Sequence, residues 1–215
     1  MISDHDRSAW FGASDTARIM GNWNTPTFRL WWLEKLGLRK STYTSPAMAA
    51  GTAYEHRVLD AIGVDRRDRQ LRNRRLRLRV NLDGETRRVV HEVKTYRAGG
   101  FNVSRAYWMQ CQVEMFAARK RCCIVAYRLT DAEYENYFLR IDLKRIGFHP
   151  IEYDPAWVRE EYLPRLRYLA WCLSRRAAPK WEEFLTLRPK IGSVRYWPWG
   201  LFLEGFRRKN GTMLR

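Results

Sequence analysis

Acidic and basic residues at the end of a predicted strand pair carry the clearest chemical signal in the sequence. Apolar and polar residues alternate before Asp83, and a short β-branched run leads into Glu92-Val93-Lys94, with a turn after Gly84 between the two. Side chains alternate across a strand, so Glu92 and Lys94 share one face and Val93 lies on the other. Carboxylates on two paired strands can hold Mg²⁺ while the lysine orients a bound water. This is the chemistry of a metal-dependent phosphodiester hydrolase.

Such a short motif also arises by chance at solvated strand ends, so its meaning depends on the rest of the chain. The 215 residues include 40 Lys and Arg against 23 Asp and Glu, a net charge of +17. This imbalance indicates a polyanionic partner, and nucleic acid is the simplest choice. A hydrophobic content of 46% and an aromatic content of 14% exclude a wholly disordered chain.

The four cysteines are Cys111, Cys122, Cys123 and Cys172, and none forms a C-x-x-C pair. Their spacing argues against zinc or iron–sulfur sites and predicts reduced cysteines in the core of an intracellular protein. The N-terminus is polar from the start, without a secretory signal, and no membrane-spanning segment is evident. We therefore expect a soluble, cytoplasmic protein.

Helix caps, apolar periodicity and turn residues outline the order of the elements. Ser14 is the expected N-cap of the first helix, and Thr25-Pro26 and Ser45-Pro46 begin the next two. The predicted helices are 14–21, 26–36, 46–62, 104–118, 155–176 and 179–187, and the predicted strands are 76–82, 89–95, 121–129 and 135–143, the last two pairing antiparallel. We expect an α/β fold with a restriction-endonuclease-like core, in which helices flank a mixed central β-sheet.

Two segments remain open to more than one interpretation. Eight arginines between residues 66 and 79 form either the solvated face of a strand or a phosphate-binding wall. Residues 1–187 are expected to form the nuclease-like domain, and residues 188–215 an aromatic and basic tail. We expect this tail to pack on the domain or to form a subunit interface. Stacking on DNA bases is the alternative.

Four blocks in the same order resemble the phage lambda-exonuclease family, including its YqaJ-type viral recombinases, within the PD-(D/E)xK nuclease superfamily. They lie between residues 7 and 175, and together are more specific than any one alone. The blocks are Arg7 with Gly12-Ala13-Ser14-Asp15, the Met48–Glu55 helix, the Asp83–Lys94 hairpin, and Ala106-Tyr107-Trp-Met-Gln110-Cys-Gln112.

The resemblance implies roles for five residues around the hairpin. Asp83, Glu92 and Glu55 would ligate two Mg²⁺ ions, for which Mn²⁺ can substitute, and the Val93 carbonyl would add a backbone oxygen. Lys94 would position the hydrolytic water. A further residue, Gln110, would hydrogen-bond the water, the lysine or a phosphate.

The family's N-terminal block receives a 5′-phosphate, which points to Ser14 here. Either Arg7 or Arg18 would be the accompanying arginine, and Tyr107 lies one turn before Gln110 on its helix.

The resemblance implies a Mg²⁺-dependent exonuclease that digests linear double-stranded DNA from 5′ to 3′ and leaves 3′ overhangs for phage-type recombination. It also implies a ring-shaped homotrimer and a single-strand annealing partner. Two alternatives are a sequence- or structure-specific endonuclease on the same core and a non-catalytic DNA-binding protein. Clustered carboxylates argue against the latter, because negative charges facing DNA cost affinity unless metal neutralises them.

Overall fold

The computed structural model describes residues 7–40, 45–97, 99–187 and 206–208. The chain forms two compact units, each assembled from separate stretches of sequence. Of the described residues, the first unit comprises 45–69, 82–97 and 99–153, and the second comprises 7–40, 70–81, 154–187 and 206–208. Within the described ranges, no helix is both long enough and apolar enough to cross a membrane.

One mixed β-sheet supplies the strands of the fold, and its hydrogen-bonded order is β5-β4-β3-β2-β1-β6. The β2–β3 and β4–β5 pairs are antiparallel, and β3 and β4 run parallel. The strands β1 and β2 contribute residues to both units. The bounds are β1 Arg66–Asn73, β2 Leu78–Glu85, β3 Val89–Tyr96, β4 Arg121–Arg128, β5 Ile146–Ile151 and β6 Phe206–Arg208. The α/β architecture with a mixed sheet is as predicted.

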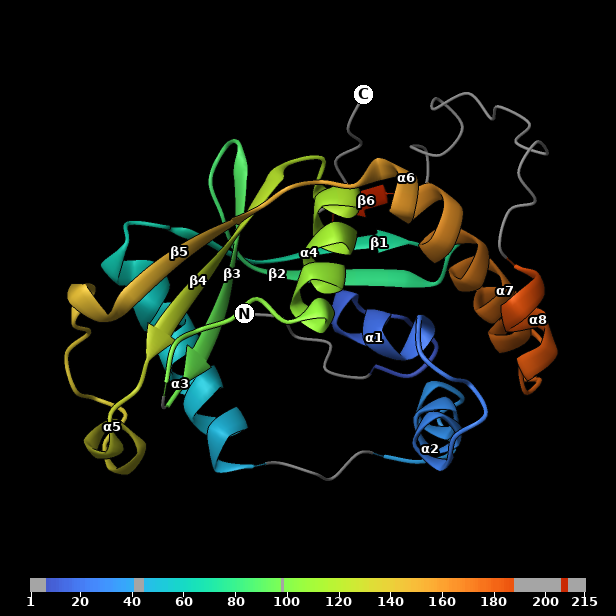
Figure 1. Cartoon of the computed structure of the whole chain (residues 1–215), viewed down its shortest axis with the longest axis horizontal. Helices are drawn as coiled ribbons and strands as arrows, with labels where there is room; N and C mark the ends of the chain where they lie inside the picture. The colour runs from blue at the N-terminus through green and yellow to red at the C-terminus, as the bar shows by residue number, and fades with distance from the viewer. Residues whose placement is uncertain (1–6, 41–44, 98, 188–205, 209–215) are drawn as a thin grey trace. The chain divides into compact units, whose positions relative to one another are not determined.

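In the first unit, helices cover both faces of β3 and β4 (Figure 1). These helices are α3, Pro46–Ala61, and α4, Arg105–Ala118, whose N-caps Ser45 and Ser104 accept hydrogen bonds from backbone N–H groups in the first turn. Val93 packs into the apolar core with residues of α3, whereas the neighbouring Glu92 bonds to Gln110 of α4. The two helices therefore lie on opposite faces of β3, as the alternation of its side chains requires.

Gly84 allows α3 to pack closely against the β2–β3 hairpin. A Cβ added at this position would lie 2.6 Å from Cδ2 of Leu59, which is buried on α3. Any side chain here would have to displace the buried side chains of Leu59 and Val64. Because α3 carries Glu55 and the hairpin carries Asp83, this close approach helps to bring the two carboxylates together.

The prediction of a strand over residues 135–143 is wrong. The chain forms helix α5, Asp131–Glu135, and the 3-10 turn η2, Leu143–Arg145, and the antiparallel partner of β4 is β5. A capping box explains the helix: the Glu133 carboxylate accepts hydrogen bonds from Thr130 N at 2.7 Å and from Thr130 Oγ1 at 2.9 Å. Burial of Glu133 ties this short helix to the core.

The arginine-rich stretch contains a strand that the sequence analysis missed, β1. Arg69 donates to both oxygens of Glu85, at 2.6 and 2.7 Å, and Arg67 is paired with Asp60. Arg72 lies over the ring of Trp10, 5.6 Å from its centroid. These arginines therefore have intramolecular partners, which supports a structural use for part of the run.

In the second unit, the first helical turns begin differently from the prediction. Gly12, not Ser14, precedes the 3-10 turn η1, Ala13–Asp15, which leads into α1, Thr16–Ile19. The Asp15 carboxylate is buried and accepts from Gly12 N at 2.8 Å, Trp31 Nε1 at 2.8 Å and Lys35 Nζ at 2.6 Å. The polar group that organises this turn is therefore Asp15, and Ser14 is exposed.

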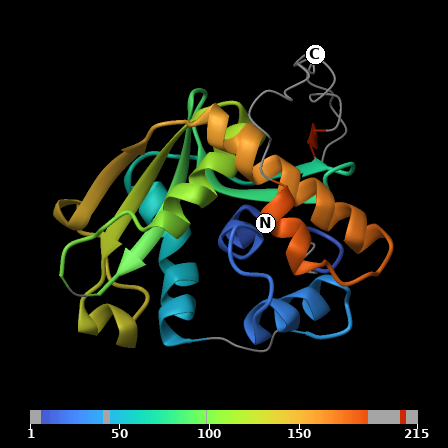
Figure 2. The same cartoon turned by 45° about the vertical axis from the view of Figure 1, so that its right-hand side comes forward.

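The other helices of the second unit follow the predicted caps. Helix α2, Pro26–Lys35, begins after Thr25, which accepts from Phe28 N at 3.1 Å. The predicted helix over 155–176 is one helical run of α6, Pro155–Trp157, the π-helical turn η3, Val158–Tyr162, and α7, Leu163–Ser174, with α8, Trp181–Thr186, after it. In both views α7 lies beside α1 (Figure 2). Of the predicted tail, all but residues 206–208 lies outside the described residues.

Candidate active site

The predicted acidic pair meets where the β2–β3 ladder ends. The paired residues are Glu85 with Val90 and Gly84 with His91. One step further, the Asp83 side chain accepts a hydrogen bond from Val93 N at 2.9 Å. At this point of the hairpin, the Asp83 carboxylate takes the place of a backbone carbonyl of β2 as the acceptor for an N–H group of β3. This hydrogen bond holds Asp83 beside the strand that carries Glu92.

A hydrogen-bonded network joins β3 to α4 next to this carboxylate pair. Glu92 Oε1 accepts from Lys94 Nζ at 2.6 Å and from Gln110 Nε2 at 2.5 Å. Lys94 Nζ also donates to Gln110 Oε1 at 3.3 Å and lies 5.0 Å from the ring centroid of Tyr107. The structure therefore brings together Glu92, Lys94, Gln110 and Tyr107, which the sequence analysis named separately.

Electrostatics link Glu55 to the same group. Burial, followed by the charges of Glu92 and Glu55, raises the pKa of Asp83 well above its usual range. Burial, followed by the charge of Glu92, raises the pKa of Glu55. For Lys94, burial favours the neutral amine, but the charge and hydrogen bond of Glu92, together with the charges of Asp83 and Glu114, raise the pKa of the ammonium. Three acidic side chains thus share a site with one cationic side chain.

Among the described residues, Glu92 Oε2 is a buried oxygen with no hydrogen-bond partner. A buried acceptor without a partner is costly, and a cation would satisfy it. The carboxylates of Asp83, Glu92 and Glu55 are hard oxygen donors, which Mg²⁺ and Mn²⁺ prefer. Their donor chemistry therefore suits a divalent cation, but the ligand groups within 4.8 Å of one another among the described residues are Glu55 with His56 and Asp68, and Cys111 with Glu114 and Cys122.

Glu55 also faces two side chains outside this group. Its Oε1 lies 4.0 Å from His56 Nε2, and the same nitrogen lies 3.2 Å from Asp68 Oδ1. These three side chains are partly exposed and close enough together to hold a metal ion. The His56–Asp68 pair is a self-sufficient hydrogen-bonded contact, so it explains this arrangement without a ligand.

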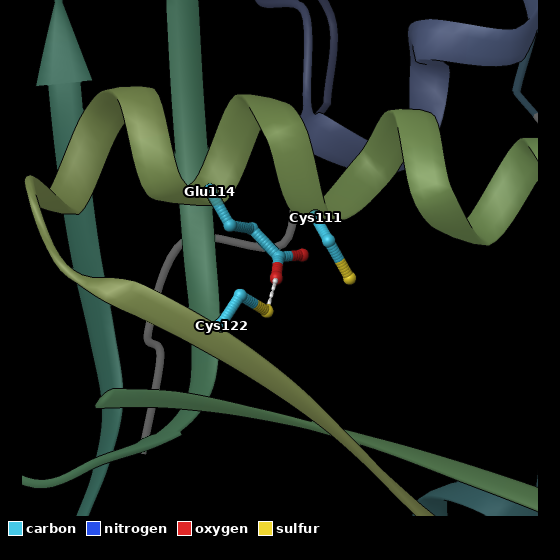
Figure 3. A group of neighbouring side chains, drawn as sticks. All are labelled: Cys111, Glu114 and Cys122. Carbon is cyan, nitrogen blue, oxygen red and sulfur yellow. Dashed lines mark hydrogen bonds between the residues drawn. The ribbon is translucent and has the colours of Figure 1, made fainter. Parts of the chain in front are cut away.

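Sequence reasoning missed Glu114, which lies one turn after Gln110 on α4. Its Oε1 accepts from Gln110 Nε2 at 2.8 Å, and its Oε2 lies 3.7 Å from Cys122 Sγ on β4, with Cys111 close by (Figure 3). Burial and then the charge of Glu92 raise the pKa of Glu114 well above its usual range. The i, i+4 spacing from Gln110 and the apolar neighbours along α4 were the available signals.

The remaining predicted residues fall in different places. The four cysteines are free, as predicted, and Cys111, Cys122 and Cys172 are buried. Arg7, Ser14 and Arg18 are exposed residues of the second unit. Val93 N is the donor to Asp83, and a role for its carbonyl remains a prediction.

Comparisons with known proteins bear on the fold. Neither a family model nor a curated protein matches the chain. Among solved structures, the alkaline exonuclease LHK-Exo of Laribacter hongkongensis has a TM-score of 0.57 and 18% identity, over 84% of this chain and 93% of that one. A phage-related exonuclease of Haemophilus somnus 129PT has a TM-score of 0.57 and 13% identity, over 82% of this chain and 95% of that one. The chain therefore has the α/β fold of these two exonucleases.

Proposed function

We propose that the protein is a nuclease that uses a divalent metal ion, Mg²⁺ or Mn²⁺, to hydrolyse phosphodiester bonds in DNA. The observation that carries this proposal is the group of Asp83, Glu92 and Glu55 beside Lys94, with one buried carboxylate oxygen that lacks a partner. Such a group has little use in a protein that only binds DNA, because unneutralised acids repel phosphate. The fold shared with two exonucleases supports the same reaction class.

Each side chain has a distinct task in this proposal. Asp83, Glu92 and Glu55 hold the cations, with the Val93 carbonyl as a further oxygen ligand, and bound cations lower the pKa of water and offset charge on the phosphate. The Lys94 ammonium has three donors, and Glu92 and Gln110 accept two of them. The third can be directed at the attacking water or at a phosphate oxygen.

The finer proposal is that of a 5′-to-3′ exonuclease on linear double-stranded DNA that leaves 3′ overhangs for single-strand annealing. The net charge of +17 supports a DNA partner. Ser14, with Arg7 or Arg18, is the proposed 5′-phosphate site, and Tyr107 the proposed DNA contact beside Lys94. A homotrimeric ring and an annealing partner belong to this proposal by resemblance.

Strand-specific digestion tests the proposal. The substrate is a linear duplex with a 5′-phosphate on one strand, labelled on each strand in turn and incubated with Mg²⁺ or with EDTA beside a closed circular duplex. We expect Mg²⁺-dependent loss of the phosphorylated strand from its 5′ end, with the circle intact. Asp83→Ala and Glu92→Ala should abolish this loss while DNA binding persists.

The other outcomes select the alternatives. Internal cuts in the linear duplex, or cleavage of the circle, would replace the exonuclease with an endonuclease on the same core. DNA binding with no cleavage under either divalent metal would leave a binding protein. Unchanged digestion by the Asp83 and Glu92 variants would remove these residues from the active site.

A further inference from the structure

Glu114 is a buried carboxyl that the proposed chemistry does not use. Its side chain projects from α4 towards β4, and the residue is 0% exposed (Figure 3). Burying a carboxyl is costly unless its oxygens are hydrogen-bonded, and an apolar side chain would fill this core position at lower cost. We therefore expect the role of Glu114 to lie in its hydrogen bonds, which join it to Gln110 and to Cys122.

Both donors and the acceptor oxygen of the Gln110 side-chain amide have hydrogen-bond partners. A primary amide has two N–H donors on its nitrogen and an acceptor on its oxygen. Gln110 Nε2 donates to Glu92 Oε1 at 2.5 Å and to Glu114 Oε1 at 2.8 Å. Its oxygen consequently faces Lys94 Nζ, at 3.3 Å. If the amide flipped, its oxygen would face the acceptor oxygen of Glu92 and its nitrogen would face the ammonium of Lys94.

Glu92 and Glu114 do not hold Gln110 in the same way. Glu92 Oε1 also accepts from Lys94, and Glu92 belongs to the group proposed to hold the cation. Glu114 lies between α4 and β4, and its second oxygen accepts a hydrogen bond from the thiol of Cys122 (Figure 3). Its contact with Gln110 therefore uses no oxygen of Glu92, although both acids bond the same amide nitrogen.

We propose that Glu114 is a positioning residue, which fixes the Gln110 amide so that its oxygen holds Lys94 in place. This inference rests on the proposed nuclease function for its effect on rate. The contact itself is a property of the folded protein and can be measured without any cleavage. The thiol of Cys122 acts indirectly: it bonds to Glu114 Oε2 and so directs Glu114 Oε1 towards Gln110.

The first test observes the amide directly in the metal-free protein. In ¹⁵N-labelled protein, the side-chain NH₂ resonances of Gln110 are assigned by their loss in Gln110→Ala. We expect Glu114→Ala to shift one of the two amide protons upfield and Glu114→Gln, which keeps an acceptor oxygen, to restore most of the shift. Met115→Ala, a buried change at the next position of α4, is the matched control for loosened packing and should leave both protons in place.

The second test is a double-mutant cycle on single-turnover cleavage, measured where each variant is folded. Glu114→Ala should lower the rate constant about 10–100-fold, as removal of an outer partner of a metal-site residue does, with little change in DNA affinity. Gln110→Ala should have a similar effect, and the double variant should be no slower than the slower single variant. Glu114→Gln should recover most of the rate.

The outcomes separate this inference from the proposed function. Amide protons that stay in place in Glu114→Ala would overturn it, as would single losses that multiply in the double variant. A Met115→Ala variant that matches Glu114→Ala in both readouts would reduce Glu114 to a packing residue. If the protein cuts no DNA, the nuclease proposal fails, while the amide resonances still decide whether Glu114 holds Gln110.

Discussion

Two acidic sites in the first unit, the buried Glu133 and the group of Asp83, Glu92 and Glu55, have opposite environments. Glu133 accepts hydrogen bonds from Tyr127 Oη at 2.6 Å, from Thr130 N at 2.7 Å and from Arg145 Nη2 at 3.0 Å, and its pKa falls to about 2. The acidic group of Asp83, Glu92 and Glu55 has one nearby ammonium for three carboxylates. Burial and mutual repulsion raise the pKa values of Asp83 and Glu55.

The difference separates a carboxylate that is paired within the fold from carboxylates that we propose bind a cation. Around Glu133, burial also favours the neutral acid, but the hydrogen bonds of Arg145, Tyr127 and Thr130 outweigh it. At Glu92, a buried oxygen has no partner among the described residues. Acidic side chains with strongly perturbed pKa values and no structural partners cluster at functional sites. Burial alone therefore does not distinguish the group of Asp83, Glu92 and Glu55 from Glu133.

The largest expected contrast is in activity. Glu92→Gln removes the charge from the acidic group, and DNA cleavage with Mg²⁺ should fall at least about 10²–10³-fold, the scale on which preorganised electrostatic groups act. Glu133→Gln removes an equal charge from the same unit, and it should retain the wild-type rate at temperatures where it is folded. Equal losses in the two variants would erase the functional distinction between the groups.

The second contrast is in the stability of the fold. Glu133→Gln removes the buried charge partner of Arg145, which keeps the more exposed Asp142 at 3.3 Å, and should lower the free energy of unfolding by about 3 kcal/mol, as loss of one member of a buried ion pair does. Urea unfolding measures this change. Glu135→Gln, an exposed glutamate at the end of α5, is the matched control and should stay within about 0.5 kcal/mol of the wild type. An equally stable Glu133→Gln protein would contradict the structural role.

The pH dependence of the unfolding free energy should also report the ionisation of Glu133. The folded-state pKa of Glu133, about 2, lies below the usual value of 4.5, so its ionised form stabilises the fold above 4.5. This contribution disappears as the pH falls from 4.5 through about 2. The gap in unfolding free energy between wild type and Glu133→Gln should therefore narrow across this window. A gap that stays constant would place its origin outside the titration of Glu133.

The smallest effect has the opposite sign. Asp83→Asn relieves repulsion within the acidic group, so in EDTA it should raise the free energy of unfolding by about 1 kcal/mol, a rise in Tm of roughly 2–4 °C. Added Mg²⁺ should raise the Tm of the wild type and leave that of Asp83→Asn nearly unchanged. A destabilised Asp83→Asn protein in EDTA would mean that its hydrogen bond from Val93 N outweighs the repulsion.

Much of the candidate site follows from local patterns in the sequence. The alternation before Asp83 and the short run through Lys94 predicted the hairpin, and Ser104 marked the start of the helix that carries Gln110. These signals act over a few residues, through side-chain alternation and capping hydrogen bonds, so they can be read without a tertiary structure.

The errors occurred where contacts between distant residues decide the outcome. Residues 135–143 have no regular strand partner, because β5 occupies the edge beside β4. Ser14 looks like a helix cap by type, but the buried Asp15 organises that turn through Trp31 and Lys35. A capping hydroxyl and a buried ion pair are equally compatible with the local sequence, and only packing distinguishes them.

The sequence by itself determined the hairpin of Asp83, Glu92 and Lys94 and the helices that carry Glu55 and Gln110, because periodicity and caps are local properties of the chain. The tertiary structure alone decided which acidic side chains have partners. Glu133 of α5 meets Arg145 of η2, Glu114 of α4 meets Cys122 of β4, and Glu92 keeps an oxygen without a partner among the described residues. The balance of burial, charge and hydrogen bonding that sets each role exists only once these elements are packed together.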